Sequence, residues 1–138
     1  MRFVYASSAA TYGDGSLGYS DADEVTPTLS PLNMYGYSKQ MFDLWALRRG
    51  IMDRIVGLKY FNVYGPREDH KGDMRSVINK AYDQIIQTGE VKLFKSYRPE
   101  YKDGEQVRDF IYVRDAVDAT LFFCDNTSES GLFNCGTG

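Results

Sequence analysis

Two near-continuous apolar segments flank one helix-like segment in the first half of the chain, and this order restricts the fold most. Residues 2–8 and 54–62 are rich in aromatic and β-branched side chains, which is typical of strands buried in a parallel sheet. Asn33 is a candidate N-cap for the helix between them, and Gly50 can end that helix in a left-handed turn. A strand, a helix and a strand predict a right-handed parallel crossover in an α/β fold.

The rest of the chain continues this α/β pattern. Its length of 138 residues suits one domain, without repeats or a linker. The sequence predicts loops at residues 13–32, 63–75 and 95–106, further helices at 76–87 and 115–126, and strands at 92–94, 107–113 and 131–136.

Composition excludes several classes of partner. The formal net charge of −3 gives no reason to expect nucleic acid or an anionic membrane surface, and no apolar run approaches the roughly 18 residues of a membrane span. Cys124 and Cys135 lack metal-ligand spacing; we expect buried free thiols in a reducing, cytoplasmic compartment, with a disulfide left open. The single His70 predicts no metal site.

Tyr35 and Lys39 stand four residues apart at the start of the predicted helix, so both side chains face the same way, one turn apart. A phenol has a pKa of about 10, and a nearby ammonium favours the phenolate needed for acid–base work. Ser8 ends the first strand, at the sheet edge where ligands of open α/β sheets bind. An ordinary aromatic–cation pair and a serine bonded to local backbone are the alternatives.

Residues 13–18 match the glycine-rich dinucleotide fingerprint G-x-G-x-x-G letter for letter. That fingerprint works only where the loop opens a helix whose N-terminus receives the pyrophosphate. Here three carboxylates and two prolines follow without helical periodicity. We therefore interpret residues 13–32 as a surface loop and not as a phosphate cradle.

Two further cations are candidates for binding. Lys71 lies in the loop that leaves the second strand, on the same sheet edge as Ser8. Arg108 offers a planar fork suited to phosphate or carboxylate. A solvated loop lysine, and an arginine paired with Asp109 or another acid, are the alternatives.

The ordered motifs resemble those of extended short-chain dehydrogenase/reductases, which are Rossmann-type enzymes acting on nucleotide sugars. The motifs are Ser7-Ser8-x-x-x-Tyr12-Gly13, Tyr35-x-x-Ser38-Lys39 and the run from Tyr60 to Arg67. Within that family the loop Gly65-Pro-Arg-Glu-Asp-His-Lys-Gly72, with residues 93–101 and 108–113, is similar to the 6-epimerases of ADP-L-glycero-D-manno-heptose. The His-Lys-Gly loop separates these enzymes from 4-epimerases and dehydratases, and the resemblance extends from Met1 to Gly138.

The resemblance implies a reaction and a role for each matching residue. The reaction is oxidation at C6″ by NADP, with NAD as the other option, to a transient ketone, and return of the hydride to the opposite face. Tyr35 would be the acid/base, Ser8 would hydrogen-bond the same oxygen, and Lys71 would be a second acid/base. Lys39 would bias the ionisation of Tyr35 and bind the cofactor, which Val63 and Lys71 would also contact. The substrate contacts would be Asn62, Asp73, Lys80, Phe94, Lys95, Ser96, Tyr97 and Arg108.

The family begins with a glycine-rich βαβ unit that this sequence does not show. We therefore expect residues 1–138 to form a single partial domain, part of a Rossmann-type parallel sheet with flanking helices plus part of the substrate-binding region. An unpaired sheet edge favours a homo-oligomer or association with a missing half. Asp73 replaces the small polar residue usual in the family, and a carboxylate there would repel a diphosphate.

Two other functions remain open from the sequence. One is a different nucleotide-sugar enzyme, a 4-epimerase or a dehydratase. The other is a non-catalytic remnant that binds nucleotide sugar weakly or serves as an assembly surface. Complementation by a separate N-terminal half would distinguish an enzyme segment from a remnant.

Overall fold

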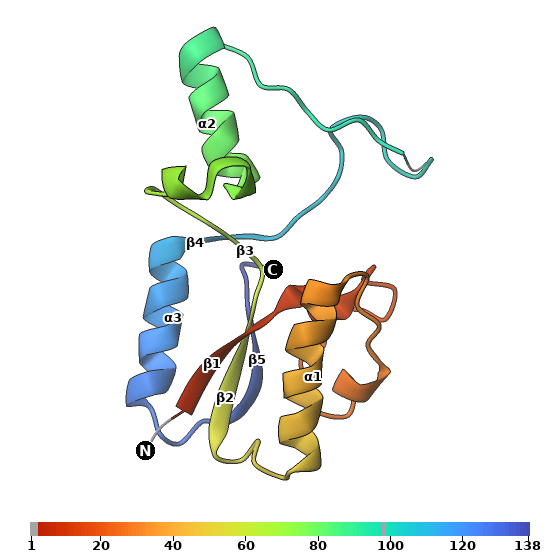
Figure 1. The fold of residues 1–138 in the computed structure, drawn as a ribbon, viewed down its shortest axis with the longest axis vertical. Coiled ribbons are helices and arrows are strands. Elements are labelled where there is room, and N and C mark those ends of the chain that lie inside the picture. Colours follow the sequence, from red (N-terminus) through yellow and green to blue (C-terminus); the bar gives the residue numbers. More distant parts are fainter. Residues whose placement is uncertain (1–2, 98) are drawn as a thin grey trace.

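The chain folds into two small parallel sheets with helices packed around them (Figure 1). A computed structural model describes residues 3–97 and 99–138. The first sheet contains β1 (Phe3–Ser8), β2 (Ile55–Tyr60) and β5 (Gly131–Cys135), in the order β1-β2-β5. The predicted α/β class is confirmed. Arg2, which we expected to open the first strand, lies outside the described residues.

The register of the first sheet brings the carboxyl ends of its strands to one edge. Ser8 pairs with Tyr60, and Tyr60 pairs with Cys135, all in parallel orientation. Side chains of a strand alternate between the two faces of a sheet. The first sheet therefore contributes to two separate core clusters. One contains Ala46 with Ile55 and Leu132, and the other contains Ala116 with Cys135.

Helices α1 (Met34–Arg48) and α3 (Val113–Asp125) flank the first sheet on opposite sides (Figure 1). The predicted boundaries of α1 are confirmed. Its N-cap Asn33 accepts a hydrogen bond from the Gly36 N–H at 2.9 Å, and Gly50 has a left-handed φ of 64°. The β1–α1–β2 unit therefore forms the predicted parallel crossover.

The second sheet pairs β3 (Asn62–Tyr64) with β4 (Phe110–Tyr112). After β3 the chain forms a 3-10 segment (Asp69–Met74), α2 (Val77–Thr88) and a long arm (residues 93–97 and 99–107) that extends away from both sheets (Figure 1). The sequence predicted one strand over residues 54–62, but the strand changes sheet after Tyr60. Loop residues 63 and 64 extend the second sheet because β4 offers them a partner.

Two other strand predictions need correction. Residues 92–94 are not a strand, and the strand predicted at 107–113 is restricted to Phe110–Tyr112. Strand propensity needs a partner strand to pair with, and among the described residues β4 pairs only with the three residues of β3. The predicted loop at 13–32 is confirmed apart from a 3-10 turn at Thr26–Thr28.

A short 3-10 helix (Ala9–Tyr12) follows β1, but the glycine-rich residues 13–18 form turns and lead into irregular backbone. The glycine-rich match therefore lacks the helix that the fingerprint needs. Gln40 of α1 holds this loop by donating to the carbonyls of Thr26 and Leu29 at 3.0 and 2.9 Å. Both cysteines are free; Cys135 is buried as predicted, but Cys124 is exposed. In the described part of the chain no helix is long and apolar enough to cross a bilayer, and no cluster of metal-ligating side chains occurs.

Candidate functional site

The first-turn residues of α1 and the end of β1 meet at the carboxyl edge of the first sheet. Gly36 makes this close approach possible, since a Cβ there would lie 2.7 Å from the Ala10 carbonyl oxygen and 2.8 Å from Cβ of Pro31. Tyr35 precedes this glycine, and Ala10 follows Ser8 by two residues. The packing therefore brings Tyr35 and Ser8 to the same edge, as the sequence predicts.

Ser8 is the last residue of β1 and is buried. Its Oγ accepts a hydrogen bond from the Ala10 N–H at 3.1 Å, and its carbonyl accepts one from Thr11 Oγ1 at 2.8 Å. A hydroxyl has one donor and two acceptor lone pairs. Among the described residues the Ser8 hydroxyl donates to none, so its proton is available to a ligand oxygen.

Tyr35 and Lys39 lie on one face of α1. Lys39 Nζ is 5.7 Å from the centroid of the Tyr35 ring and donates to the Ala6 carbonyl at 3.0 Å. The Tyr35 residue is 57% exposed, and its hydroxyl has no hydrogen-bond partner in the described part of the chain. The pair therefore presents a free phenol and an ammonium side by side, next to β1.

Lys71 lies in the 3-10 segment, held by a buried carboxylate that the sequence did not single out. Its Nζ is 3.4 Å from Glu68 Oε2. Glu68 also accepts hydrogen bonds from Ser76 N and Oγ, at 2.8 and 2.7 Å, and from Gly65 N at 3.1 Å. A glutamate located between a Gly-Pro turn and a helix N-cap is the signal that could have identified it. No hydrogen bond or ion pair within the described ranges joins Lys71 to Tyr35 or Ser8.

Protonation of Glu68 should weaken this loop. Burial alone would raise the pKa of its carboxyl, but the Ser76 and Gly65 hydrogen bonds and the nearby Lys71 bring that pKa down to about 2 from 4.5. A lowered pKa stabilises the fold above pH 4.5, and this stabilisation disappears as the pH falls toward 2. The difference corresponds to about 3 kcal/mol.

We therefore expect Glu68→Gln to destabilise the chain at pH 7 and to have much less effect near pH 2.5. Urea unfolding at the two pH values measures this difference. Glu90→Gln, at an exposed position, is the matched control and should change little at either pH. An equal loss of stability from Glu68→Gln at both pH values would contradict the assignment.

The residues expected to contact substrate are divided between the second sheet and the segments beyond it. Asn62 donates through Nδ2 to the Asp109 carbonyl at 2.8 Å. Lys80 donates to the backbone carbonyl of Asp73, which brings these two predicted residues together. Arg108 is exposed and donates to the Val107 carbonyl at 3.0 Å. The described residues contain no ion pair of Arg108, so the alternative of a structural pair with Asp109 is not observed.

The segment from Phe94 to Tyr97 lies on the projecting arm, which extends away from both sheets (Figure 1). The Gly104 N–H donates to the Phe94 carbonyl at 2.9 Å, and Asp103 accepts from the Ser96 N–H at 2.7 Å. These bonds fold the arm back on itself. Phe94 and Tyr97 are 64% and 92% exposed, so both side chains are largely open to solvent.

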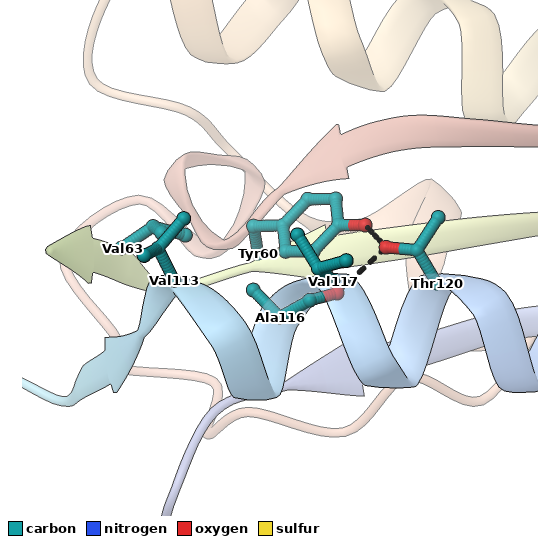
Figure 2. Close-up of a pocket in the computed structure, with 6 residues that line it drawn as sticks. All are labelled: Tyr60, Val63, Val113, Ala116, Val117 and Thr120. Atoms are coloured by element: carbon teal, nitrogen blue, oxygen red, sulfur yellow. Dashed lines mark hydrogen bonds between the residues drawn. The ribbon is translucent and has the colours of Figure 1, made fainter. Parts of the chain in front are cut away.

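Val63 packs at one end of a shallow apolar groove between β2, β3 and α3 (Figure 2). At the other end the Tyr60 hydroxyl contacts Thr120 Oγ1 at 2.5 Å, and Thr120 donates to the Ala116 carbonyl at 2.6 Å. Because the Thr120 proton is used in that bond, Tyr60 is the donor of the pair. The Val63 side chain is partly buried and packs against the core cluster that contains Ala116 and Cys135.

Comparison with known proteins gives consistent matches. The profile of the NAD dependent epimerase/dehydratase family matches residues 1–136. The ADP-L-glycero-D-manno-heptose-6-epimerase of Nitratidesulfovibrio vulgaris is 63% identical over 137 residues, which cover 99% of this chain. The chain spans 42% of the length of that relative.

Two solved structures of epimerases also match this chain. The crystal structure of the Helicobacter pylori ADP-L-glycero-D-manno-heptose-6-epimerase matches with a TM-score of 0.75 and 36% identity, over 98% of this chain and 40% of that one. The Thermus thermophilus UDP-glucose 4-epimerase, in complex with NAD, matches with a TM-score of 0.70 and 31% identity, over 99% of this chain and 43% of that one.

Proposed function

This chain belongs to the NAD dependent epimerase/dehydratase family, and on that premise we propose that it carries the catalytic residues of an ADP-L-glycero-D-manno-heptose 6-epimerase, an enzyme that supplies the heptose precursor of lipopolysaccharide. The observation that carries this proposal is the joint position of Tyr35, Lys39 and Ser8 at one sheet edge. The 63% identity to an enzyme of that name supports the choice of substrate.

Lys39 fits the ribose of a dinucleotide cofactor, for which we propose NADP in preference to NAD. An ammonium has three donors, and in the described structure Lys39 Nζ uses one of them, on the Ala6 carbonyl. The remaining donors would be available to ribose hydroxyls of the cofactor, and Lys39 itself lines a hollow together with Phe3, Tyr5, Ser38 and Phe42. When bound, the nicotinamide supplies hydride acceptance and return at the sugar carbon.

Proton transfer at the sugar oxygen is assigned to Tyr35 and Ser8. Tyr35 as phenolate takes the proton of the C6″ hydroxyl as the C6″–H bond breaks, giving a ketone. Ser8 donates a hydrogen bond to the same oxygen and fixes its direction. After the carbon presents its other face, hydride returns to C6″ and a proton returns to the oxygen. A positioned acid or base contributes about 10²- to 10⁴-fold to such a step.

Lys71 is assigned to the proton transfer on the opposite face, because an inverted C6″ no longer directs its oxygen toward Tyr35. The ion pair with Glu68 holds the ammonium in a defined place at the start of this loop. Asn62, Asp73, Lys80, the Phe94–Tyr97 segment and Arg108 complete the assignment as substrate contacts.

Association with further protein belongs to the same proposal. The exposed face of α1 carries large apolar side chains, among them Met34, Met41 and Trp45, at 81%, 69% and 47% exposure. Exposed apolar side chains in such number favour burial against another chain. Formation of a homo-oligomer would cover these side chains, and so would association with the remaining part of the family's fold. We place this association in the cytoplasm.

A chimaera tests the function directly. The matching segment of the Nitratidesulfovibrio vulgaris relative is replaced by this chain, and the product of ADP-heptose is analysed by NMR at C6″. We expect a mixture of the two C6″ epimers. A folded chimaera that leaves ADP-heptose unchanged and interconverts UDP-glucose and UDP-galactose would replace the proposal with the 4-epimerase alternative that the 31% identical structure represents.

A further inference from the structure

A buried ion pair lies beneath the site, between β2 and α1. Lys59 Nζ is 3.4 Å from Asp43 Oδ2, and both side chains are completely buried. Lys59 is the penultimate residue of the otherwise apolar strand β2, and Asp43 follows Lys39 by four residues on α1. Because residues four apart share a helix face, Tyr35, Lys39 and Asp43 follow one another along one side of α1. Asp43 is the buried member of this series and contacts Lys59.

The pair is the centre of a hydrogen-bond network that reaches the end of β1. Asp43 accepts hydrogen bonds from the Tyr5 hydroxyl at 2.8 Å and from Ser7 Oγ at 2.7 Å. Lys59 Nζ donates to Thr11 Oγ1 at 2.8 Å, and Thr11 donates to the Ser8 carbonyl at 2.8 Å. Asp43 is therefore connected to β1 through Tyr5 and Ser7, and Lys59 is connected through Thr11 to the turn that follows Ser8.

Stability alone does not account for this arrangement. Removing two charges from water costs free energy that their attraction repays only with excellent geometry, and well-packed apolar residues of similar size often replace a buried pair without loss. Burial lowers the pKa of the Lys59 ammonium, which shows that cost, although Asp43 offsets part of it. What an apolar pair could not provide is a set of directed bonds to Ser7 and Thr11.

We propose that Lys59 and Asp43 are positioning residues, whose hydrogen bonds to Ser7 and Thr11 fix the turn at Ser8 relative to the α1 face that carries Tyr35. A catalytic effect of the pair rests on the proposed function. That the pair fixes the turn at Ser8 rests only on the hydrogen-bond network. The pair acts through Ser8 and has no contact of its own with the reacting atoms.

Amide hydrogen exchange in the chain itself tests the structural content. The Ala10 N–H donates to Ser8 Oγ, so its protection reports the turn. In Lys59→Met/Asp43→Leu we expect the chain to stay folded, the amides of Val56 and Leu58 to stay protected, and Ala10 to exchange about tenfold faster or more. Arg54→Met, which removes an exposed cation beside β2, is the control and should leave Ala10 unchanged. Unchanged Ala10 protection in a stable double variant would overturn the proposal.

If the double variant does not fold, Thr11→Val gives the second test. It keeps the ion pair and removes the link from Lys59 to the Ser8 carbonyl. The same loss of Ala10 protection is expected, and retained protection would refute the role of the network.

Turnover by the chimaera tests whether the pair affects catalysis. The double variant should lower kcat about 10²-fold with little change in KM, as expected when Ser8 is displaced by about 1 Å. Ser8→Ala should lower kcat in the otherwise wild-type chimaera. In the double variant Ser8→Ala should lower kcat hardly any further, because the two changes affect one interaction. Fully additive losses would overturn the positioning role. A wild-type chimaera without turnover would instead reject the proposed function, while Ala10 exchange would still decide on the network.

Discussion

Tyr35→Phe should reduce turnover of ADP-heptose by the chimaera by about 10²- to 10⁴-fold, since it removes the single hydroxyl assigned to proton transfer at C6″. The substitution keeps the ring, which lies 5.7 Å from Lys39 Nζ and is largely exposed. We therefore expect an unchanged fold, an unchanged melting temperature and similar substrate affinity, with the loss confined to kcat.

Tyr37→Phe is the matched control. Tyr37 stands two residues further along the same helix, is 44% exposed, and loses the same single atom. Residues two apart on a helix do not face the same way, so this variant should retain full turnover. Equal losses in the two variants would indicate a general effect on α1. Full turnover in Tyr35→Phe would reject Tyr35 as the acid/base.

Lys71→Met should lower kcat by about 10²-fold or more, because it removes the second proton-transferring group. Lys71→Arg should not restore activity, since a guanidinium is always protonated in proteins. Kinetic analysis with each variant separates a loss in kcat from a loss in KM. Lys92→Met, which removes a lysine from the exposed segment before the arm, serves as control and should behave as wild type.

The Lys71 variants also distinguish the candidate functions. A 4-epimerase returns hydride to a ring carbon and has no assigned use for this loop, so its turnover would be insensitive to Lys71→Met. A loss that appears only in KM would assign Lys71 to substrate binding and would contradict its role as second acid/base.

Local features of the site could be predicted from the sequence. The Asn33 cap, the four-residue spacing of Tyr35 and Lys39, and the left-handed Gly50 each depend on a few neighbouring residues. The position of Ser8 at the sheet edge followed from the order of strand and helix. These features require no knowledge of the distant contacts.

Features that depend on distant partners could not be predicted. Residues 92–94 have strand-like side chains but find no partner strand in the described structure, whereas residues 63 and 64, expected to begin a loop, pair with β4. Lys59 and Asp43 meet across two elements, and the loop role of Glu68 depends on Ser76 eight residues later. A charged side chain near the end of an otherwise apolar strand was the available signal for Lys59.

The most direct test of the account follows the hydrogen at C6″. ADP-heptose deuterated at that carbon is converted by the chimaera in ordinary water, and the product is examined by NMR. Oxidation and return of the same hydride predict that the epimer of inverted configuration keeps its deuterium at C6″. Replacement of that deuterium by solvent hydrogen would contradict the account, because it would show inversion by proton removal from carbon instead of hydride transfer.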